Sequence, residues 1–176
     1  FTWSPRALPN ATAACLGYNV FVPAGFDFGA GGVLPGFASD APLENDAAGN
    51  PLHGFSLPIR WGNDGALGVM PLSEDWKKSS FQPADKKGQA KLEKGRWMRI
   101  DQEIVLNNPG QANGLLRLWI DGEIRLERRD MTYRMIEVQK LSAVQADVHL
   151  ADRKELPAND PAKRTLRISP LELRIQ

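Results

Sequence analysis

The sequence is poor in the residues that cross-link small proteins or hold metal ions. Its 176 residues include one cysteine, Cys15, and two histidines, His53 and His149. A single thiol cannot close an internal disulfide, and the two histidines lack the spacing of a zinc site. We therefore expect no metal and no cofactor, and we expect Cys15 to be a small buried apolar residue.

Long apolar runs and an excess of one charge are also missing. No stretch approaches the roughly 20 apolar residues of a membrane-spanning helix, which argues against membrane insertion. Twenty-two basic residues against 21 acidic ones give a net charge of +1. This balance does not favour nucleic acid as a partner. The sequence Gly-Ala-Gly-Gly at 29–32 does not open a βαβ unit, and no Gly-x-Ser-x-Gly elbow occurs.

Apolar and polar residues alternate with a period of two over much of the chain. In 96–107 Met98, Ile100, Ile104 and Leu106 alternate with Trp97, Arg99, Asp101 and Glu103, which predicts a half-buried strand. In 114–129 two such runs flank Asp121-Gly122, which predicts a hairpin with a type I′ turn. The residues predicted to face the core are Met98, Ile100, Ile104, Leu106, Leu116, Leu118 and Ile120.

Other segments with strand character fall at 16–23, 54–62, 65–72, 132–141, 143–150 and 165–175. Pro58 cannot donate to a ladder, so its strand should be an edge strand or carry a bulge. A short helical turn is plausible only within 84–93. About nine or ten short strands separated by turns predict an all-β fold, a β-sandwich or a barrel, and an antiparallel β-sandwich of the jelly-roll type is the form in which two sheets pack face to face. The length suits a single domain, 1–176.

Tryptophan and arginine alternate on the predicted polar sides of these strands. Trp119 is close to Arg117, and Trp97 is close to Arg99. Indole rings stack on the apolar faces of sugars, and a guanidinium binds a carboxylate through two hydrogen bonds, which suits an acidic sugar. Alternatively, the tryptophans fill the core or cover sheet edges, and Arg117 pairs with a glutamate across strands.

Three segments resemble the alginate lyases of polysaccharide lyase family 14. They are GYNVFVPAGFDFGAGGVLPGF (17–37), FSLPIRW (55–61) and GRWMRIDQEIVLNNPGQANGLLRLWIDGEI (95–124). The second is similar to a family strand that carries Phe-Ser and ends in Trp, and the third to a family stretch that ends in Trp-x-Asp-Gly. The resemblance covers about 16–134 and leaves 135–176 as closing strands. It implies a jelly roll, an acidic polysaccharide such as alginate as the partner, and a secreted or periplasmic location.

The residues that this family uses for β-elimination are replaced here. The family places a lysine before Leu-Pro-Gly, an arginine two residues after the strand serine, and two tyrosines on the next strand. This chain keeps Ser56 but has Val33 and Pro58 at the first two positions and no tyrosine in 65–72. Elimination requires a cation that neutralises the uronate carboxylate and a base that removes the C5 proton. The resemblance therefore implies a polysaccharide-binding relative without the family's catalytic residues.

Three hypotheses remain open at this point. The first is a non-catalytic protein that binds an acidic polysaccharide. The second is an active lyase or hydrolase that rebuilt its site from other groups, such as His53, Tyr133 and Arg60. The third is a structural domain of a larger secreted protein, with no sugar site. The candidate ligand contacts are Ser56, Arg60, Arg99, Arg117 and Trp119.

Overall fold

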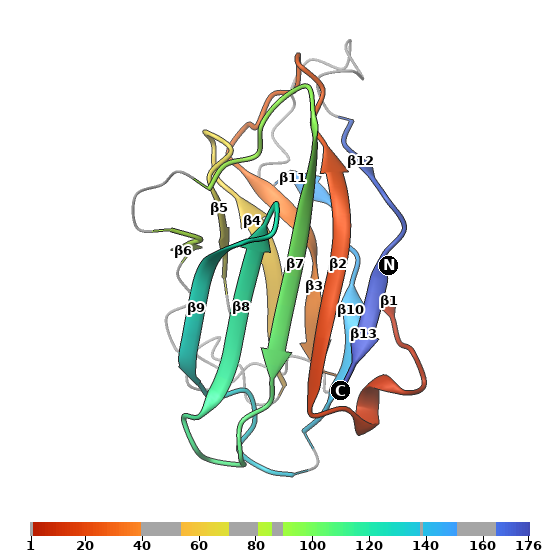
Figure 1. Cartoon of the computed structure of the whole chain (residues 1–176), viewed down its shortest axis with the longest axis vertical. Coiled ribbons are helices and arrows are strands. Elements are labelled where there is room, and N and C mark those ends of the chain that lie inside the picture. The colour runs from red at the N-terminus through yellow and green to blue at the C-terminus, as the bar shows by residue number, and fades with distance from the viewer. Residues whose placement is uncertain (1, 40–53, 71–80, 86–89, 138, 151–164) are drawn as a thin grey trace, which may run out of the picture.

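The computed structural model of the chain describes residues 2–39, 54–70, 81–85, 90–137, 139–150 and 165–176. They form two antiparallel sheets packed face to face as a β-sandwich of the jelly-roll type (Figure 1). The one helix within these ranges is the short 3₁₀ helix η1, Leu8–Asn10. The predicted all-β fold is confirmed. The described residues within 84–93 form no helical turn.

One layer, which we call sheet A, contains seven of the described strands. Its spatial order is β1 (Thr2–Trp3), β10 (Leu141–Gln145), β3 (Gly32–Ser39), β4 (Ser56–Trp61), β5 (Leu67–Val69) and β6 (Gln82–Pro83). The seventh strand, β11 (His149–Leu150), pairs with β3 on the same edge as β10, at the other end of β3.

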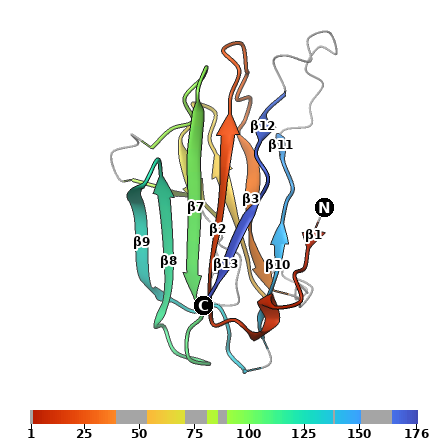
Figure 2. The ribbon, with the colours of Figure 1, turned by 45° about the vertical axis from the view of Figure 1, so that its right-hand side comes forward.

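The second layer, sheet B, contains six of the described strands. Its spatial order is β12 (Arg167–Ile168), β2 (Ala13–Phe21), β7 (Trp97–Val105), β8 (Gly114–Ile120) and β9 (Glu123–Met131). The remaining strand, β13 (Glu172–Ile175), pairs with β2 on the same edge as β12. Figure 2 shows the two layers from an angle, with β9, β8, β7 and β2 to the left of β3 and β10.

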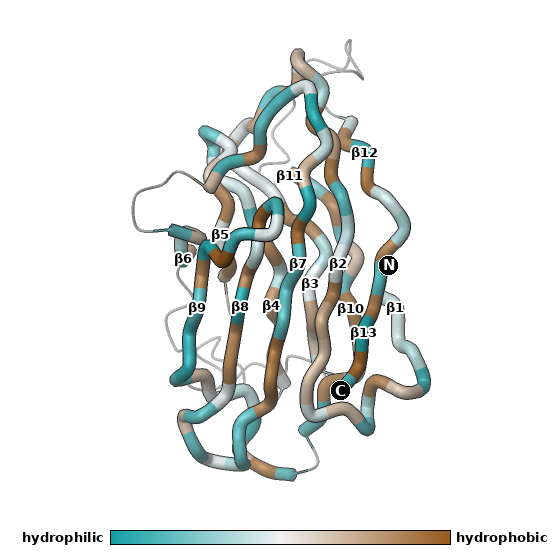
Figure 3. Tube along the Cα trace, viewed as in Figure 1, coloured by the Kyte–Doolittle hydropathy of each residue, from teal (hydrophilic) through white to brown (hydrophobic). Residues whose placement is uncertain are grey.

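The core lies between the sheets, and the period-two pattern places its side chains. All seven residues predicted to face inward on and beside β7 and β8 are at most 7% exposed. Apolar and polar residues alternate along these strands in Figure 3. Leu34, Leu57 and Ile59 of sheet A close the core from the other side and are 0% exposed. Full burial of such a side chain contributes about 1.5–3 kcal/mol, so this interface stabilises the sandwich.

The turn between β8 and β9 has the predicted geometry. Asp121 has φ 52° and Gly122 has φ 83°, and a type I′ turn requires positive φ at both central positions. The Asp121 carboxylate also accepts a hydrogen bond from the N–H of Arg99 at 2.8 Å and pairs with Arg96 at 2.8 Å. The turn is thereby anchored to β7 and to the segment before it.

Pro58 lies in an interior strand and opposes a bulge. β4 is paired on both sides, so the expected edge position is wrong. The register between β3 and β4 shifts between Leu34 and Phe37, where two residues of β3 stand opposite Pro58, so the bulge lies in the partner strand and the expected bulge in the strand of Pro58 is also wrong. Gln102 of β7 reaches across the core to this place: it accepts a hydrogen bond from the Phe37 N–H at 3.1 Å and donates one to the Leu57 carbonyl at 2.9 Å.

The predicted strand at 132–141 is wrong. β9 ends at Met131, β10 begins at Leu141, and the described residues between them form a loop. Asn107 explains this change, because its side-chain oxygen accepts hydrogen bonds from the N–H groups of Tyr133 and Arg134 at 2.8 and 3.0 Å. These donors are therefore not available to a neighbouring strand.

The two expected strands nearest the C-terminus are each divided. Segment 143–150 contributes to β10 and β11, and segment 165–175 contributes β12 and β13. Pro170 lacks an N–H and falls between β12 and β13. The Ser169 hydroxyl accepts a hydrogen bond from the Asn19 N–H at 2.9 Å, which holds the break against β2.

Candidate functional site

A row of side chains crosses the outer face of sheet A on β11, β3 and β4. His149 pairs with Val33, Val33 pairs with Arg60, and Arg60 pairs with Gly68 on β5. Directly paired residues project to the same face of a sheet, so these side chains are neighbours. Strands in a sheet are about 4.8 Å apart, which places the backbones of His149 and Arg60 about 10 Å from each other.

Arg60 carries an uncompensated charge in this row. Its side chain is partly exposed, but its Nε is buried and has no hydrogen-bond partner, and no described carboxylate pairs with it. Loss of solvent around the guanidinium lowers the pKa of Arg60. Leaving a buried donor unpaired costs about 1–3 kcal/mol. A ligand carboxylate bound at this position would meet both an opposite charge and a free hydrogen-bond donor.

Ser56 lies on the same face but is covered. It is 2% exposed, and its hydroxyl donates a hydrogen bond to the Gln145 side-chain oxygen on β10 at 2.5 Å. Val33 is 6% exposed. Of Ser56, Val33, Arg60 and His149, the partly exposed Arg60 and the exposed His149 are the ones that solvent reaches most.

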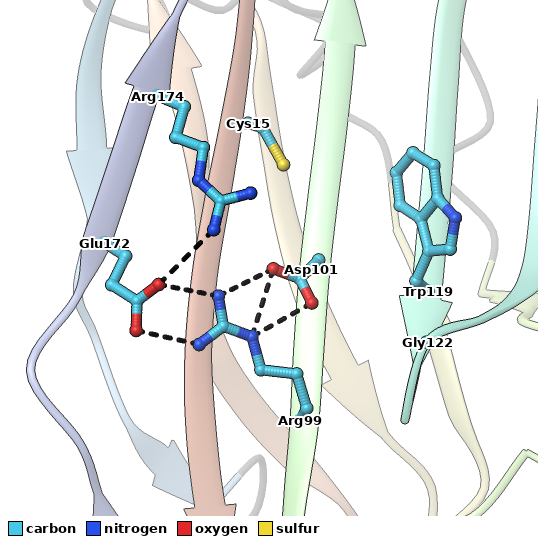
Figure 4. Close-up of a pocket in the computed structure, with 7 residues that line it drawn as sticks. All are labelled: Cys15, Arg99, Asp101, Trp119, Gly122, Glu172 and Arg174. Carbon is cyan, nitrogen blue, oxygen red and sulfur yellow. Dashed lines mark hydrogen bonds and ion pairs between the residues drawn. The ribbon is translucent and has the colours of Figure 1, made fainter.

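Arg99 lies on the outer face of sheet B, on the far side of the sandwich from Arg60. Its guanidinium binds Asp101 at 2.8 Å and Glu172 at 2.9 Å (Figure 4). These carboxylates raise the pKa of Arg99, and Arg99 in turn lowers the pKa of Glu172. The charge of Arg99 is therefore already balanced within the protein.

Arg117 is balanced in the same way on the same face. Its Nε donates to Glu127 at 2.6 Å and its Nη1 to Glu103 at 3.2 Å. The hydrogen bond to Glu127 is the main cause of the raised pKa of Arg117. Its guanidinium also lies 6.0 Å from the centre of the Trp119 ring. The cross-strand pairing with glutamate is therefore the arrangement that the structure adopts.

Trp119 borders an open hollow on the outer face of sheet B (Figure 4). The hollow has a volume of about 440 Å³ and is also lined by Cys15, Asp101 and Arg174. Cys15 is partly exposed and points outward from β2, so the expectation that it is a buried apolar residue is wrong. Of the predicted ligand contacts, Ser56 and Arg60 therefore lie on the outer face of sheet A, whereas Arg99, Arg117 and Trp119 lie on the outer face of sheet B.

Both tyrosines of the chain are structural groups of the core. Tyr133 is 3% exposed and donates its hydroxyl to the Leu115 carbonyl at 2.8 Å. Tyr18 is 0% exposed and donates to the Pro35 carbonyl at 3.0 Å. Burial raises the pKa of both phenols well above the usual value. Neither hydroxyl is placed to reach a polymer bound at the surface. The other candidate catalytic residue, His53, lies outside the described residues.

His149 is the site residue that sequence reasoning missed. Its place beside Val33 depends on the pairing of β11 with β3, two segments far apart in the chain. β11 has only two residues, too few to produce a periodic pattern. No local signal therefore reports that this histidine shares a face with Arg60.

Two further findings bear on chemistry and location. Within the described residues, no three histidine, cysteine, aspartate or glutamate side chains are grouped closely enough to hold a metal ion. No helix in the described part of the chain has the length and apolar character needed to cross a membrane.

The fold is similar to those of solved polysaccharide lyases. An alginate lyase from Chlorella virus matches with a TM-score of 0.80 and 18% identity, over 100% of this chain and 76% of that one. A PL-14 alginate lyase from Aplysia kurodai matches with a TM-score of 0.71 and 17% identity, over 98% and 74%. An endo-β-1,4-glucuronan lyase from the fungus Trichoderma reesei matches with a TM-score of 0.67 and 12% identity, over 93% and 68%.

Sequence comparison identifies the family. No curated protein matches the chain. The sequence model described as Polysaccharide lyase 14 matches residues 1–149, a span that includes the whole segment in which we noted the resemblance. Together with the jelly-roll architecture, this match shows that the chain belongs to the polysaccharide lyase 14 family.

Proposed function

We propose that this protein binds an acidic polysaccharide, a polyuronate such as alginate, without cleaving it. The observation that carries the proposal is Arg60 on the outer face of sheet A, whose buried Nε has no hydrogen-bond partner among the described residues. A uronate carboxylate can accept hydrogen bonds from the Nε and Nη groups of one arginine together, and this bond is strong because both partners are charged. The described carboxylates do not compete for Arg60 as they do for Arg99 and Arg117.

The residues around Arg60 support binding better than elimination. Val33 and Pro58 stand where the family resemblance implies a lysine and an arginine, and neither can neutralise a carboxylate. Removal of the C5 proton also needs a base, and both phenols of the chain donate to backbone carbonyls inside the core. Without the cation pair and the base, the barrier to β-elimination stays several kcal/mol too high for useful catalysis.

The names of the structural relatives are consistent with this class of ligand. They are an alginate lyase and a glucuronan lyase, whose substrates are both uronate polymers. A polymer of this type is encountered outside the cytoplasm, so the location we propose is secreted or periplasmic.

The proposal is tested by calorimetric titration with alginate oligosaccharides. Arg60→Ala should weaken binding about tenfold or more, the value of a charge-assisted hydrogen bond. Arg129→Ala is the matched control, because Arg129 is an exposed arginine of β9 on the other sheet that pairs with Glu127. Binding should weaken with salt, because exposed charges are screened within about 8 Å at physiological ionic strength. Equal losses in both variants would contradict a site at Arg60.

One observation favours a second candidate, an active lyase with a rebuilt site. His149 is exposed and stands one strand from Val33 and two from Arg60, so a histidine base and an arginine cation flank one position on sheet A. Growth of unsaturated uronate absorbance that is lost in both His149→Ala and Arg60→Ala would establish this alternative. If no polyuronate binds and none is cleaved, the protein is a structural domain.

A further inference from the structure

A glycine at the centre of β2 makes room for Arg99, which lines the hollow beside Trp119. Gly17 pairs with Glu172 on one side and with Asp101 on the other. A Cβ at this position would lie 2.0 Å from an Nη of Arg99 and 2.4 Å from an Asp101 oxygen. A glycine inside a strand often marks a place where another group approaches the backbone closely. Here it admits the guanidinium of Arg99, which lies between Asp101 and Glu172.

The hollow is an open surface depression with room for a small ligand. Its volume of about 440 Å³ lies within the range of roughly 300–1,000 Å³ found for small-molecule sites. Figure 4 shows the Trp119 indole on one side, the side chains of Glu172 and Arg174 on the other, and Asp101 with Arg99 between them. The site therefore combines one flat apolar surface with several polar groups.

The charged side chains that line the hollow balance one another, whereas Arg60 has no carboxylate partner among the described residues. Arg99 and Arg174 are balanced by Asp101 and Glu172, and Arg99 donates from Nε, Nη1 and Nη2 to these two carboxylates. A uronate carboxylate entering here would meet two carboxylates whose positions are already fixed. The hollow thus disfavours an acidic sugar and favours an uncharged one.

The polar groups retain bonding capacity that a sugar can use. Each carboxylate oxygen has more than one lone pair, so Asp101 and Glu172 can still accept from hydroxyl groups. Arg174 is 73% exposed, and its nearest approach to Glu172 is 3.8 Å, beyond a good hydrogen bond. Because Arg99 holds the two carboxylates in place, little side-chain entropy is lost when a ligand binds.

We infer that this hollow binds one ring of a neutral oligosaccharide. The apolar face of the ring stacks on Trp119, and its hydroxyl groups donate to Asp101 and Glu172 and accept from Arg174. The protein then has two glycan sites on opposite outer faces of the sandwich. The site at Arg60 selects a charged polymer, and the site at Trp119 selects an uncharged one.

The single cysteine provides a direct reporter of occupancy. Cys15 lines the hollow, and no other thiol exists in the chain. Burial and the nearby Asp101 and Glu103 raise the pKa of the thiol, so alkylation by iodoacetamide should be followed at mildly alkaline pH. The probes are cellohexaose, mannohexaose and laminarihexaose, with an alginate hexasaccharide for comparison. At least one neutral oligosaccharide should slow the alkylation in a saturable way, and the alginate oligosaccharide should not.

Variants show whether such protection comes from the hollow. Trp119→Ala should raise the concentration needed for protection about tenfold, as expected when an aromatic anchor is removed. Arg174 is exposed, so its replacement should leave folding intact. Arg174→Ala should also raise the concentration needed for protection. Trp97→Ala is the matched control, because Trp97 is 50% exposed and does not line the hollow.

Two results overturn the inference. One is that none of the three neutral oligosaccharides slows alkylation of Cys15. The other is that protection is the same in Trp119→Ala, Arg174→Ala and the wild type. Because the readout is the Cys15 thiol on sheet B, either failure leaves the titration at Arg60 untouched.

Discussion

Gln102 is a polar side chain in the middle of an apolar core, and its loss should be costly. It extends from β7 of sheet B and is 0% exposed. It links two backbone groups of sheet A, the N–H of Phe37 and the carbonyl of Leu57, at 3.1 and 2.9 Å. Both lie at the bulge opposite Pro58, where the register of β3 and β4 shifts. The substitution Gln102→Met removes this link and retains the length of the side chain.

The expected loss follows from these two hydrogen bonds. Methionine nearly conserves the volume of glutamine, so little of the effect comes from a cavity. Each buried backbone group that loses its partner costs about 1–3 kcal/mol. Part of this cost is offset, because the buried glutamine amide no longer has to be desolvated. We expect the free energy of unfolding to fall by about 2–4 kcal/mol.

Urea unfolding followed by tryptophan fluorescence measures this change. The transition midpoint of Gln102→Met should fall with little change in slope, because the surface exposed on unfolding is nearly the same. Gln111→Met is the matched control: Gln111 is exposed in the loop before β8, and its replacement should change stability by less than about 0.5 kcal/mol. A loss below about 1 kcal/mol for Gln102→Met would refute the claim that this amide holds the two sheets together.

Three other predictions concern stability. Leu118→Ala should cost about 2–5 kcal/mol in denaturant melts, because Leu118 is 0% exposed, and a loss under about 1 kcal/mol would show that the core face is misassigned. Arg60→Met should raise the free energy of unfolding by about 1 kcal/mol, since it removes a buried donor that has no partner; a clear decrease would mean that Arg60 is satisfied in the folded protein. Arg117→Ala should cost at most about 1 kcal/mol, because its partners Glu103 and Glu127 lie at the surface, and a loss of several kcal/mol in thermal melts would contradict this.

The parts of the fold that the sequence predicts well are those specified by local sequence patterns. In β7 and β8, the alternation of apolar and polar residues specifies the buried face without reference to any partner strand. Asp121 and Gly122 specify their turn because these residue types readily adopt positive φ. The family resemblance implies the jelly roll, whereas alternation alone allows a sandwich or a barrel.

The errors arise where distant residues override the local pattern. Segment 132–141 has strand-like composition, but Asn107 captures the N–H groups of Tyr133 and Arg134 and turns the chain. The placement of Cys15 also failed, because an apolar segment led us to expect burial on both faces of β2. Its neighbours across the outer face, Arg174 and Glu103, are polar and belong to other strands.

The candidate site shows the same limit more sharply. Arg60 and Arg117 look alike in the sequence. Each lies in a predicted strand, where a tryptophan follows Arg60 directly and Arg117 after one intervening residue. Register gives Arg117 the two neighbours Glu103 and Glu127, whereas Arg60 is paired with Val33 and Gly68. Strand pairing therefore decides which of the two arginines has a carboxylate partner among the described residues.

The most direct test of the central claim compares these two arginines with one ligand. Alginate oligosaccharides are titrated into the wild type, Arg60→Ala and Arg117→Ala at low and at physiological salt, and the dissociation constants are compared. We predict that Arg60→Ala loses about tenfold or more in affinity and much of the salt dependence, and that Arg117→Ala retains both. Loss of affinity in Arg117→Ala with unchanged binding in Arg60→Ala would contradict the account and place the polyuronate site on sheet B.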